Sequence, residues 1–224
     1  MNNITSPLDT QQPNTYPIIT KNYQSMNDYI DNLFSRYARL LVLRVDLDYK
    51  KNKDIPFMNT NEVYEAYWQA KEDREHLFKN TRTNQIFDDM VGYIWKLEYG
   101  ERAGFHNHMV FFYDGSKVQQ DITIAKMIGQ YWENNITQGR GRAYNCNAHK
   151  EKYERCGIGM INWNEFELIA NLKLAAQYLA KPDEYISTFM TDIDIGRTFG
   201  RGTIKEKTET RGKPRNQLYP EIIL

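Results

Sequence analysis

The sequence predicts an α+β domain in which an antiparallel β-sheet of about five strands is flanked by helices. Three observations support this fold class. Several short stretches alternate between apolar and polar residues, as half-buried strands do, whereas others repeat apolar residues at three- and four-residue spacing, as helices do. The two kinds follow one another in mixed order without an internal repeat. Two strand-like stretches are also joined by a short link bounded by Gly100 and Gly104, which favours an antiparallel hairpin.

The first two helices are predicted from periodicity and from capping residues. A helix is expected from Ser25, because apolar residues recur there at helical spacing; these are Met26, Ile30, Leu33, Phe34, Tyr37 and Leu41. A charged helix is expected over residues 60–78, with Asn59 or Thr60 as its N-cap.

Two further helices are expected in the second half of the chain. One covers residues 121–134. The other is the best marked: it begins at Asn164, has Glu167 in the capping-box position, and runs to Lys181, where Pro182 stops it.

Five stretches are expected to be strands: residues 41–48, 92–99, 105–113, 142–147 and 157–161. In the first, the alternation places Leu41, Leu43, Val45 and Leu47 on one face and Val42, Arg44, Asp46 and Asp48 on the other. From the sequence alone, Arg44 and Asp46 either line a site or pair with each other, and both alternatives stay open.

The chain length and the uneven distribution of polar residues suggest three parts. With 224 residues, one domain with appendages is expected. Residues 1–22 are polar and proline-containing and indicate a flexible arm, and residues 23–190 form the predicted domain. Residues 191–224 form a basic extension, because Gly196 to Pro220 holds seven Lys or Arg against two acidic residues.

Composition favours a protein of the reducing cytoplasm. Lys+Arg and Asp+Glu both total 29, so net charge gives no indication of a nucleic-acid partner, although a local basic patch remains compatible with it. No apolar run approaches the roughly 20 residues that span a bilayer, and no signal pattern opens the chain. Cys146 and Cys156 form no CxxC pair and no disulfide framework.

The tripeptide His106-Asn107-His108 is the strongest chemical signal. On a strand both imidazoles project to one face while Asn107 points to the other, and two of the four histidines of the chain are used here. A hairpin would bring Glu98 beside them as a third ligand. Two imidazoles and one carboxylate suit a divalent cation such as Mn²⁺ or Mg²⁺. The alternative is that both histidines are ordinary strand residues.

A second signal is Tyr178-Leu179-Ala180-Lys181. The i,i+3 spacing places the phenol of Tyr178 and the ammonium of Lys181 on one helical face. A tyrosine can act as a nucleophile toward phosphorus, and a lysine beside it can stabilise charge. With 16 tyrosines in the chain, a packing role for Tyr178 is the alternative.

Together, the segments 95–101, 105–111 and 175–181 resemble the acidic strand, the HUH motif and the nucleophile helix of the HUH endonuclease superfamily. More narrowly, the chain resembles the replication-initiation proteins of filamentous phages (inoviruses) and the related YagK/YfjJ C-terminal domain family. This resemblance covers residues from about 38 to 190. It differs from the family pattern at Asn107, where an apolar residue is typical, and in the first strand, which usually is rich in threonine.

The resemblance implies a fold and an activity. The fold is a Rep-nuclease-like sheet with a ferredoxin- or RRM-like core. The activity is nicking of single-stranded origin DNA in rolling-circle replication: Mn²⁺ or Mg²⁺ held by Glu98, His106 and His108 polarises the phosphate, and Tyr178, assisted by Lys181, forms a 5′-phosphotyrosine and leaves a free 3′-hydroxyl.

The same resemblance implies partners and a setting. Five arginines are candidates for contacts with DNA: Arg44, Arg140, Arg142, Arg197 and Arg201. Tyr185 lies beyond Pro182, off the i+4 position relative to Tyr178, so a single-tyrosine nuclease is expected. No P-loop follows, so a helicase and a polymerase of a bacterial host are expected to act with it in the cytoplasm.

Two other functions compete with this one. A cupin-type metal protein shares the start of the GxxxxxHxH pattern, but Phe112 and Tyr113 stand where its glutamate is needed, and the regular short strands of a barrel are missing. A non-catalytic origin-binding protein or repressor on the same scaffold is the main alternative.

Overall fold

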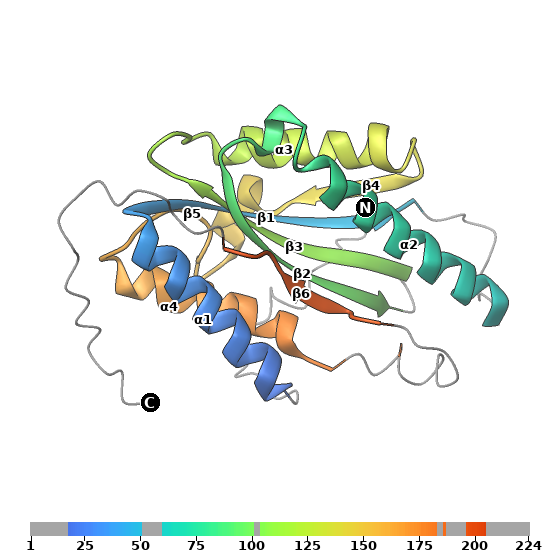
Figure 1. Ribbon diagram of the computed structural model, residues 1–224, viewed down its shortest axis with the longest axis horizontal. Helices are drawn as coiled ribbons and strands as arrows, with labels where there is room; N and C mark the ends of the chain where they lie inside the picture. The colour runs from blue at the N-terminus through green and yellow to red at the C-terminus, as the bar shows by residue number, and fades with distance from the viewer. Residues whose placement is uncertain (1–17, 51–59, 101–103, 183–185, 187–195, 205–224) are drawn as a thin grey trace.

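One antiparallel sheet organises the computed structural model, which describes residues 18–50, 60–100, 104–182, 186 and 196–204 (Figure 1). The strands are β1 (Arg39–Tyr49), β2 (Met90–Gly100), β3 (Gly104–Asp114), β4 (Gly141–Asn145), β5 (Gly159–Asn162) and β6 (Phe199–Arg201). Their order is β4-β1-β3-β2-β6, and β5 pairs with β1 as well. Every pairing is antiparallel. The predicted fold class is confirmed, with six strands in the described part of the chain.

The two short strands β4 and β5 share one edge of the sheet. Residues 45–49 of β1 pair with β4, and residues 39–42 of β1 pair with β5. The long hairpin of β2 and β3 fills the centre, and its register places Glu98 directly opposite His106. The other edge is β6, which pairs with residues 94–96 of β2.

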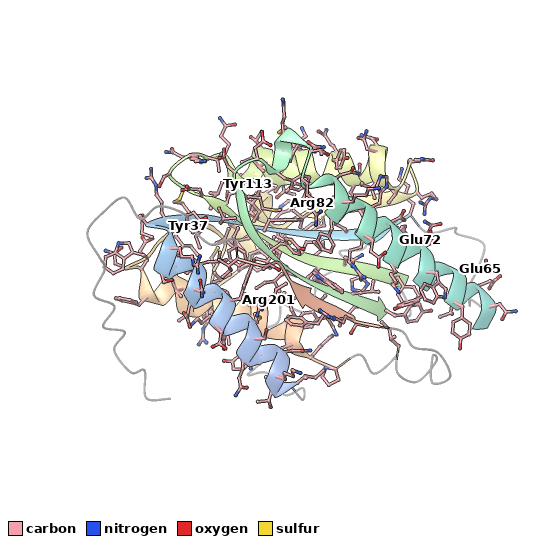
Figure 2. All side chains as sticks on the ribbon, in the orientation of Figure 1. Tyr37, Glu65, Glu72, Arg82, Tyr113 and Arg201 are labelled. Atoms are coloured by element: carbon pink, nitrogen blue, oxygen red, sulfur yellow. The ribbon has the colours of Figure 1, made fainter. Side chains whose placement is uncertain are left out.

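Two pairs of helices cover the two faces of the sheet (Figure 1). Helices α1 (Thr20–Arg36) and α4 (Phe166–Gln177) pack on the face that carries Leu40, Val42, Ile94, Val110 and Phe112. Helices α2 (Thr60–Asn80) and α3 (Asp121–Tyr131) pack on the face that carries Leu41, Leu43, Val45 and Leu47. The alternation predicted for the first strand is therefore confirmed. Glu65 and Glu72 lie on the outer side of α2 (Figure 2).

The helix limits differ from the prediction at several ends. Helix α1 begins at Thr20 rather than at Ser25. Helix α4 begins at Phe166, and its N-cap Glu165 makes no side-chain capping bond, so the predicted capping box is wrong. The Glu165 carboxylate instead accepts hydrogen bonds from the backbone N and the Nδ2 of Asn162, at 2.6 and 2.8 Å, and thereby closes the turn after β5.

Four short helical segments also occur among the described residues, and the last of them, Tyr178–Ala180, follows α4. A 3₁₀ helix covers Gln85–Phe87, a π-helix (Trp132–Ile136) continues α3, and a further 3₁₀ helix covers Cys146–Lys152. Strand β6 was not expected, and it falls within the range assigned to the basic extension. The division of the chain at residues 22 and 190 stays a prediction. Among the described residues, no helix combines the length and the apolar character that crossing a membrane requires.

Asn107 faces the core between α2 and the sheet. A polar residue at this position predicts that this face of β3 is less dry, and that prediction is wrong: Asn107 has an exposed fraction of 0% and is paired in register with Leu47 and Leu97, both core residues. Neither Nδ2 nor Oδ1 of its amide has a hydrogen-bond partner among the described residues. A buried amide without partners lowers stability.

Replacing Asn107 with valine is therefore expected to stabilise the fold. Valine suits a central strand and carries no polar group, so Asn107→Val should raise the free energy of unfolding by about 1–3 kcal/mol, measured by urea denaturation. Metal binding is the control, because the side chain points away from the histidine pair and the affinity should not change. A loss of stability in this variant would contradict the interpretation.

Candidate metal and tyrosine site

The histidine pair lies on the face of β3 toward α1 and α4, beside Glu98. Because β2 and β3 pair antiparallel with Glu98 opposite His106, the carboxylate and both imidazoles project to the same side. The rings of His106 and His108 are perpendicular, with centroids 4.8 Å apart. The hairpin thus gathers the three predicted ligands.

The donor atoms of these three residues converge. His108 Nε2 lies 3.0 Å and His106 Nε2 lies 3.6 Å from Glu98 Oε2. All three donors lie within 4.8 Å of one another. Donors that share one ion at about 2.1 Å each lie about 3.0–3.5 Å apart, so the two separations from Glu98 Oε2 are close to those of a loaded site.

The other nitrogen of each imidazole is held by an acceptor. His106 Nδ1 donates to the carbonyl oxygen of Gly104 at 3.0 Å, and His108 Nδ1 donates to Asp46 Oδ1 at 2.8 Å. Gly104 has a φ of 69°, in the left-handed region that favours glycine. A carbonyl or a carboxylate only accepts, so Nδ1 carries the hydrogen in both rings and Nε2 is the atom available as a ligand.

Asp46 is the centre of a second, buried network. Besides His108, it accepts from Arg44 Nη2 at 3.2 Å and from Cys146 Sγ at 3.8 Å. Burial alone would raise the pKa of Asp46, but Arg44 and His108 hold this pKa well below its usual range. Burial, and then the charge of Asp46, raises the pKa of the Cys146 thiol to about 12, so the thiol stays protonated and can donate. Arg44 and Asp46 therefore pair with each other, and Asp46 also lines the site.

Interactions within the cluster shift the pKa values of Glu98 and His108 in opposite directions. Burial would raise the pKa of Glu98, but hydrogen bonds from His106 and His108 and the charge of Lys181 hold this pKa far below its usual range. Burial would lower the pKa of His108, but Asp46 and Glu98 raise it to about 9. A cation at the three ligands would take the place of the proton on His108 Nε2.

Tyr178 reaches this cluster from the end of α4. Its Oη donates to Glu98 Oε2 at 2.6 Å, and its ring lies 5.5 Å from that of His108. Lys181 Nζ donates to Tyr178 Oη at 2.6 Å and forms an ion pair with Glu98 Oε1. The five residues predicted to form the metal site and the nucleophile therefore lie in one group.

The local backbone at Tyr178 differs from the prediction. Helix α4 ends at Gln177, and Tyr178–Ala180 form a 3₁₀ turn with Lys181 as its C-cap. In a 3₁₀ helix residues i and i+3 eclipse each other, so the ammonium of Lys181 comes to lie 4.0 Å from the centroid of the Tyr178 ring. We refer to residues 178–181 as the tyrosine turn.

Two further hydrogen bonds hold the backbone of the tyrosine turn, one from the residue before α1 and one from strand β2. The backbone N–H of Ile19 donates to Ala180 O at 2.9 Å, and Lys96 Nζ donates to Lys181 O at 3.0 Å. Sequence reasoning missed Lys96, which is fully buried on β2. The signal was present, because strand alternation places Lys96 on the same face as Glu98.

Three of the predicted DNA-contacting arginines form ion pairs with carboxylates of the chain. Arg44 is buried and paired with Asp46. Arg142 pairs with Asp48, its register partner on β1, with Nε 2.9 Å from Oδ1. Arg140 Nη2 donates to Asp73 on α2 at 3.1 Å, on the opposite side of the sheet from the histidines.

The remaining two arginines lie near β6. Arg201 lies beside α1, where its Nε donates to Ser25 Oγ at 2.9 Å and its guanidinium lies 5.0 Å from the centroid of the Tyr29 ring (Figure 2). Arg197 is exposed. Tyr185 lies outside the described residues.

The donor set fits a divalent cation. Two imidazole Nε2 atoms and one carboxylate oxygen, with each Nδ1 already fixed by an acceptor, form the arrangement of a preorganised site for metals of borderline hardness. Glu98, His106 and His108 would be the ligands. Tyr178 and Lys181 lie beside them on the open side.

The fold and the site define a class: a mixed α/β domain whose antiparallel sheet carries two histidines, a glutamate, a tyrosine and a lysine at one hairpin. The comparison with known families assigns the chain to a narrower group. The model of the YagK/YfjJ C-terminal domain family matches residues 9–201 of the 224, and the chain belongs to that family. No curated protein and no solved structure matches it.

Metal binding by the three ligands can be tested directly. Isothermal titration with Mn²⁺ should find one site, and His106→Ala should weaken its affinity by more than about 100-fold, because loss of a ligand exceeds the about 10–100-fold loss typical of an outer partner. His76→Ala is the matched control, since His76 is exposed on α2. Equal affinity in the two variants would remove these residues as ligands.

Proposed function

We propose that the chain is an HUH-type replication initiator that nicks single-stranded origin DNA, of the kind that starts rolling-circle replication in inoviruses and related prophage elements. One observation carries the proposal. Tyr178 Oη lies 2.6 Å from the same Glu98 oxygen toward which both histidine Nε2 atoms converge, and Lys181 Nζ lies 2.6 Å from Oη. A packing role for Tyr178 would not require this arrangement.

The proposed step is a transesterification. Tyr178 Oη attacks a backbone phosphorus of the DNA, so an Oη–P bond forms and the bond from phosphorus to the 3′-oxygen breaks. The phenol loses its proton, and the leaving 3′-oxygen gains one to become a hydroxyl. No water and no oxidant are consumed, and the phosphodiester is retained as a 5′-phosphotyrosine for later rejoining.

The residues of the cluster have separate roles in this step. Glu98, His106 and His108 would hold Mn²⁺ or Mg²⁺, which when bound supplies Lewis-acid polarisation of a phosphoryl oxygen. Lys181 stabilises negative charge at Oη, because its ammonium already donates to that oxygen. Glu98 accepts the phenol hydrogen bond and orients Oη toward the ligand atoms.

The substrate class follows from the position of the nucleophile. Tyr178 is only 3% exposed and lies on a short turn against the sheet, so the scissile phosphate must come to it. An unpaired strand can bend into such a site, whereas the backbone of a duplex is less accessible. The exposed Arg197 and the half-exposed Arg142, which would exchange its ion pair with Asp48, are candidates for contacts with phosphate. A host helicase and polymerase would extend the 3′-hydroxyl in the cytoplasm.

The nucleophile is tested with a labelled hairpin or single-stranded origin oligonucleotide and Mn²⁺. Wild-type protein should form a covalent adduct that is visible on a denaturing gel, and Tyr178→Phe should form none, because no oxygen is left to bond phosphorus. Tyr144→Phe is the matched control on the exposed strand β4 and should retain the adduct.

A cleavage yield in Tyr178→Phe equal to wild type would rule out Tyr178 as the nucleophile. Binding of the oligonucleotide without any adduct in wild-type protein would favour the alternative, a non-catalytic origin-binding protein or repressor on this scaffold.

The variant His106→Ala should lose DNA cleavage but keep DNA binding. Removing this ligand should reduce nicking by more than about 100-fold while the affinity for DNA stays within about threefold, since phosphate contacts by basic residues dominate affinity. Fluorescence anisotropy and single-turnover nicking measure the two quantities. Nicking at the wild-type rate would exclude a role for the histidine cluster.

A further inference from the structure

Three central strands place a row of polar residues on the site face. Asp46 on β1 is the register partner of His108 on β3, and Lys96 on β2 is the register partner of His108 from the other side. Directly opposed residues of an antiparallel pair project to the same face, so Asp46, His108 and Lys96 form one line across the sheet.

We propose that Asp46 and Lys96 are positioning residues that control the two halves of the site separately. Asp46 determines the metal affinity by orienting His108. Lys96 determines the position of Tyr178 Oη relative to the ligand atoms by holding the tyrosine turn. The nicking measurements below rest on the proposed function, whereas the metal-binding and spectroscopic measurements do not.

Asp46 is fitted to orient His108. Its Oδ1 lies 2.8 Å from His108 Nδ1, and its Oδ2 is held by Arg44 and Cys146. The carboxylate therefore cannot turn away from the imidazole without breaking two other contacts. Its charge makes His108 a more basic ligand, and its direction aims Nε2 at Glu98.

Lys96 is fitted to hold the tyrosine turn. A lysine with an exposed fraction of 0% is costly to bury unless its ammonium is bonded, and here Nζ donates to Lys181 O at 3.0 Å. Pro182 has no N–H and follows an extended Lys181 (ψ 153°), so the helix cannot continue beyond the turn. Lys96 thus ties the end of the turn to the same strand that carries Glu98.

The two residues act on different covalent segments. Asp46 contacts Arg44 on β1, His108 on β3 and Cys146 in the 3₁₀ helix Cys146–Lys152. Lys96 donates instead to Lys181 O in the tyrosine turn. The metal affinity and the position of Tyr178 should therefore respond to different substitutions. This separation is the testable content of the proposal.

The Asp46 half is tested with Asp46→Asn, which keeps the size of the side chain and removes its charge. Calorimetric affinity for Mn²⁺ should fall about 10–100-fold, and raised Mn²⁺ should restore nicking. Asp48→Asn is the matched control: it lies on the same strand face but pairs with Arg142. An Asp46→Asn affinity within about twofold of the Asp48→Asn affinity overturns this half.

The Lys96 half is tested with Lys96→Met, which preserves chain length and removes the ammonium. Affinity for Mn²⁺ should stay within about twofold, while single-turnover nicking falls about 10–100-fold and is not restored by Mn²⁺, because a misplacement of about 1 Å can cost 100-fold in rate. Lys173→Met is the matched control, since Lys173 joins α4 to Asp31 of α1 and has no contact with the turn. Lys96→Arg should recover part of the rate.

A measurement independent of nicking uses 3-fluorotyrosine incorporated at position 178. Its ¹⁹F resonance should shift or broaden in Lys96→Met and stay unchanged in Lys173→Met, with thermal melting confirming that both variants fold. An unchanged resonance, or a loss of Mn²⁺ affinity equal to that in Asp46→Asn, overturns the Lys96 half. If wild-type protein forms no adduct, the proposed function fails, but the calorimetric and ¹⁹F results still decide the positioning roles.

Discussion

The contacts of a single carboxylate oxygen organise this site. Glu98 Oε2 lies 2.6 Å from Tyr178 Oη and 3.0 Å from His108 Nε2, and the ammonium of Lys181 pairs with the other oxygen. A carboxylate with only a tenth of its side chain exposed requires such partners, because burying an uncompensated charge is costly. Residues from two strands and from the tyrosine turn are thus drawn to one point, and any change in the β2–β3 register would disperse them.

The fold explains why this point lies where it does. The face of the sheet near β5 is filled by apolar side chains of α1 and α4, and the polar row of Asp46, His108 and Lys96 begins where that packing ends. Helix α4 changes there to a 3₁₀ turn, and Pro182 prevents its continuation. Apolar packing of α4 therefore places Tyr178 at the boundary between the apolar part of this face and the polar row, and polar contacts hold it there.

Much of this arrangement could be predicted from the sequence, because it depends on local periodicity. Strand alternation places His106 and His108 on one face, and the glycine-bounded link places Glu98 across from them. Other features depend on tertiary contacts. The 3₁₀ geometry at Tyr178, the start of α4 without a capping box, the burial of Asn107 and strand β6 follow from packing partners far away in the sequence, which no local pattern reveals. Lys96 is intermediate: alternation places it on the site face, but only the position of the tyrosine turn shows what it bonds.

The two halves of the site differ in how firmly they are built, and this difference bears on the chemistry. The candidate ligands lie on the β2–β3 hairpin, where Glu98 and His106 are register partners and His108 is paired with both β1 and β2, and each Nδ1 has its own acceptor. Tyr178 lies on one short turn that is joined to β2 by the bond from Lys96 and to the start of α1 by the bond from Ile19. In the proposed reaction, Oη would exchange its hydrogen bond to Glu98 for a bond to phosphorus, whereas the ligand atoms would not need to move. A ligand half held by strand pairing and an adjustable tyrosine half would meet this requirement, because Oη could leave Glu98 and return to it without disturbing the donors that would hold the cation.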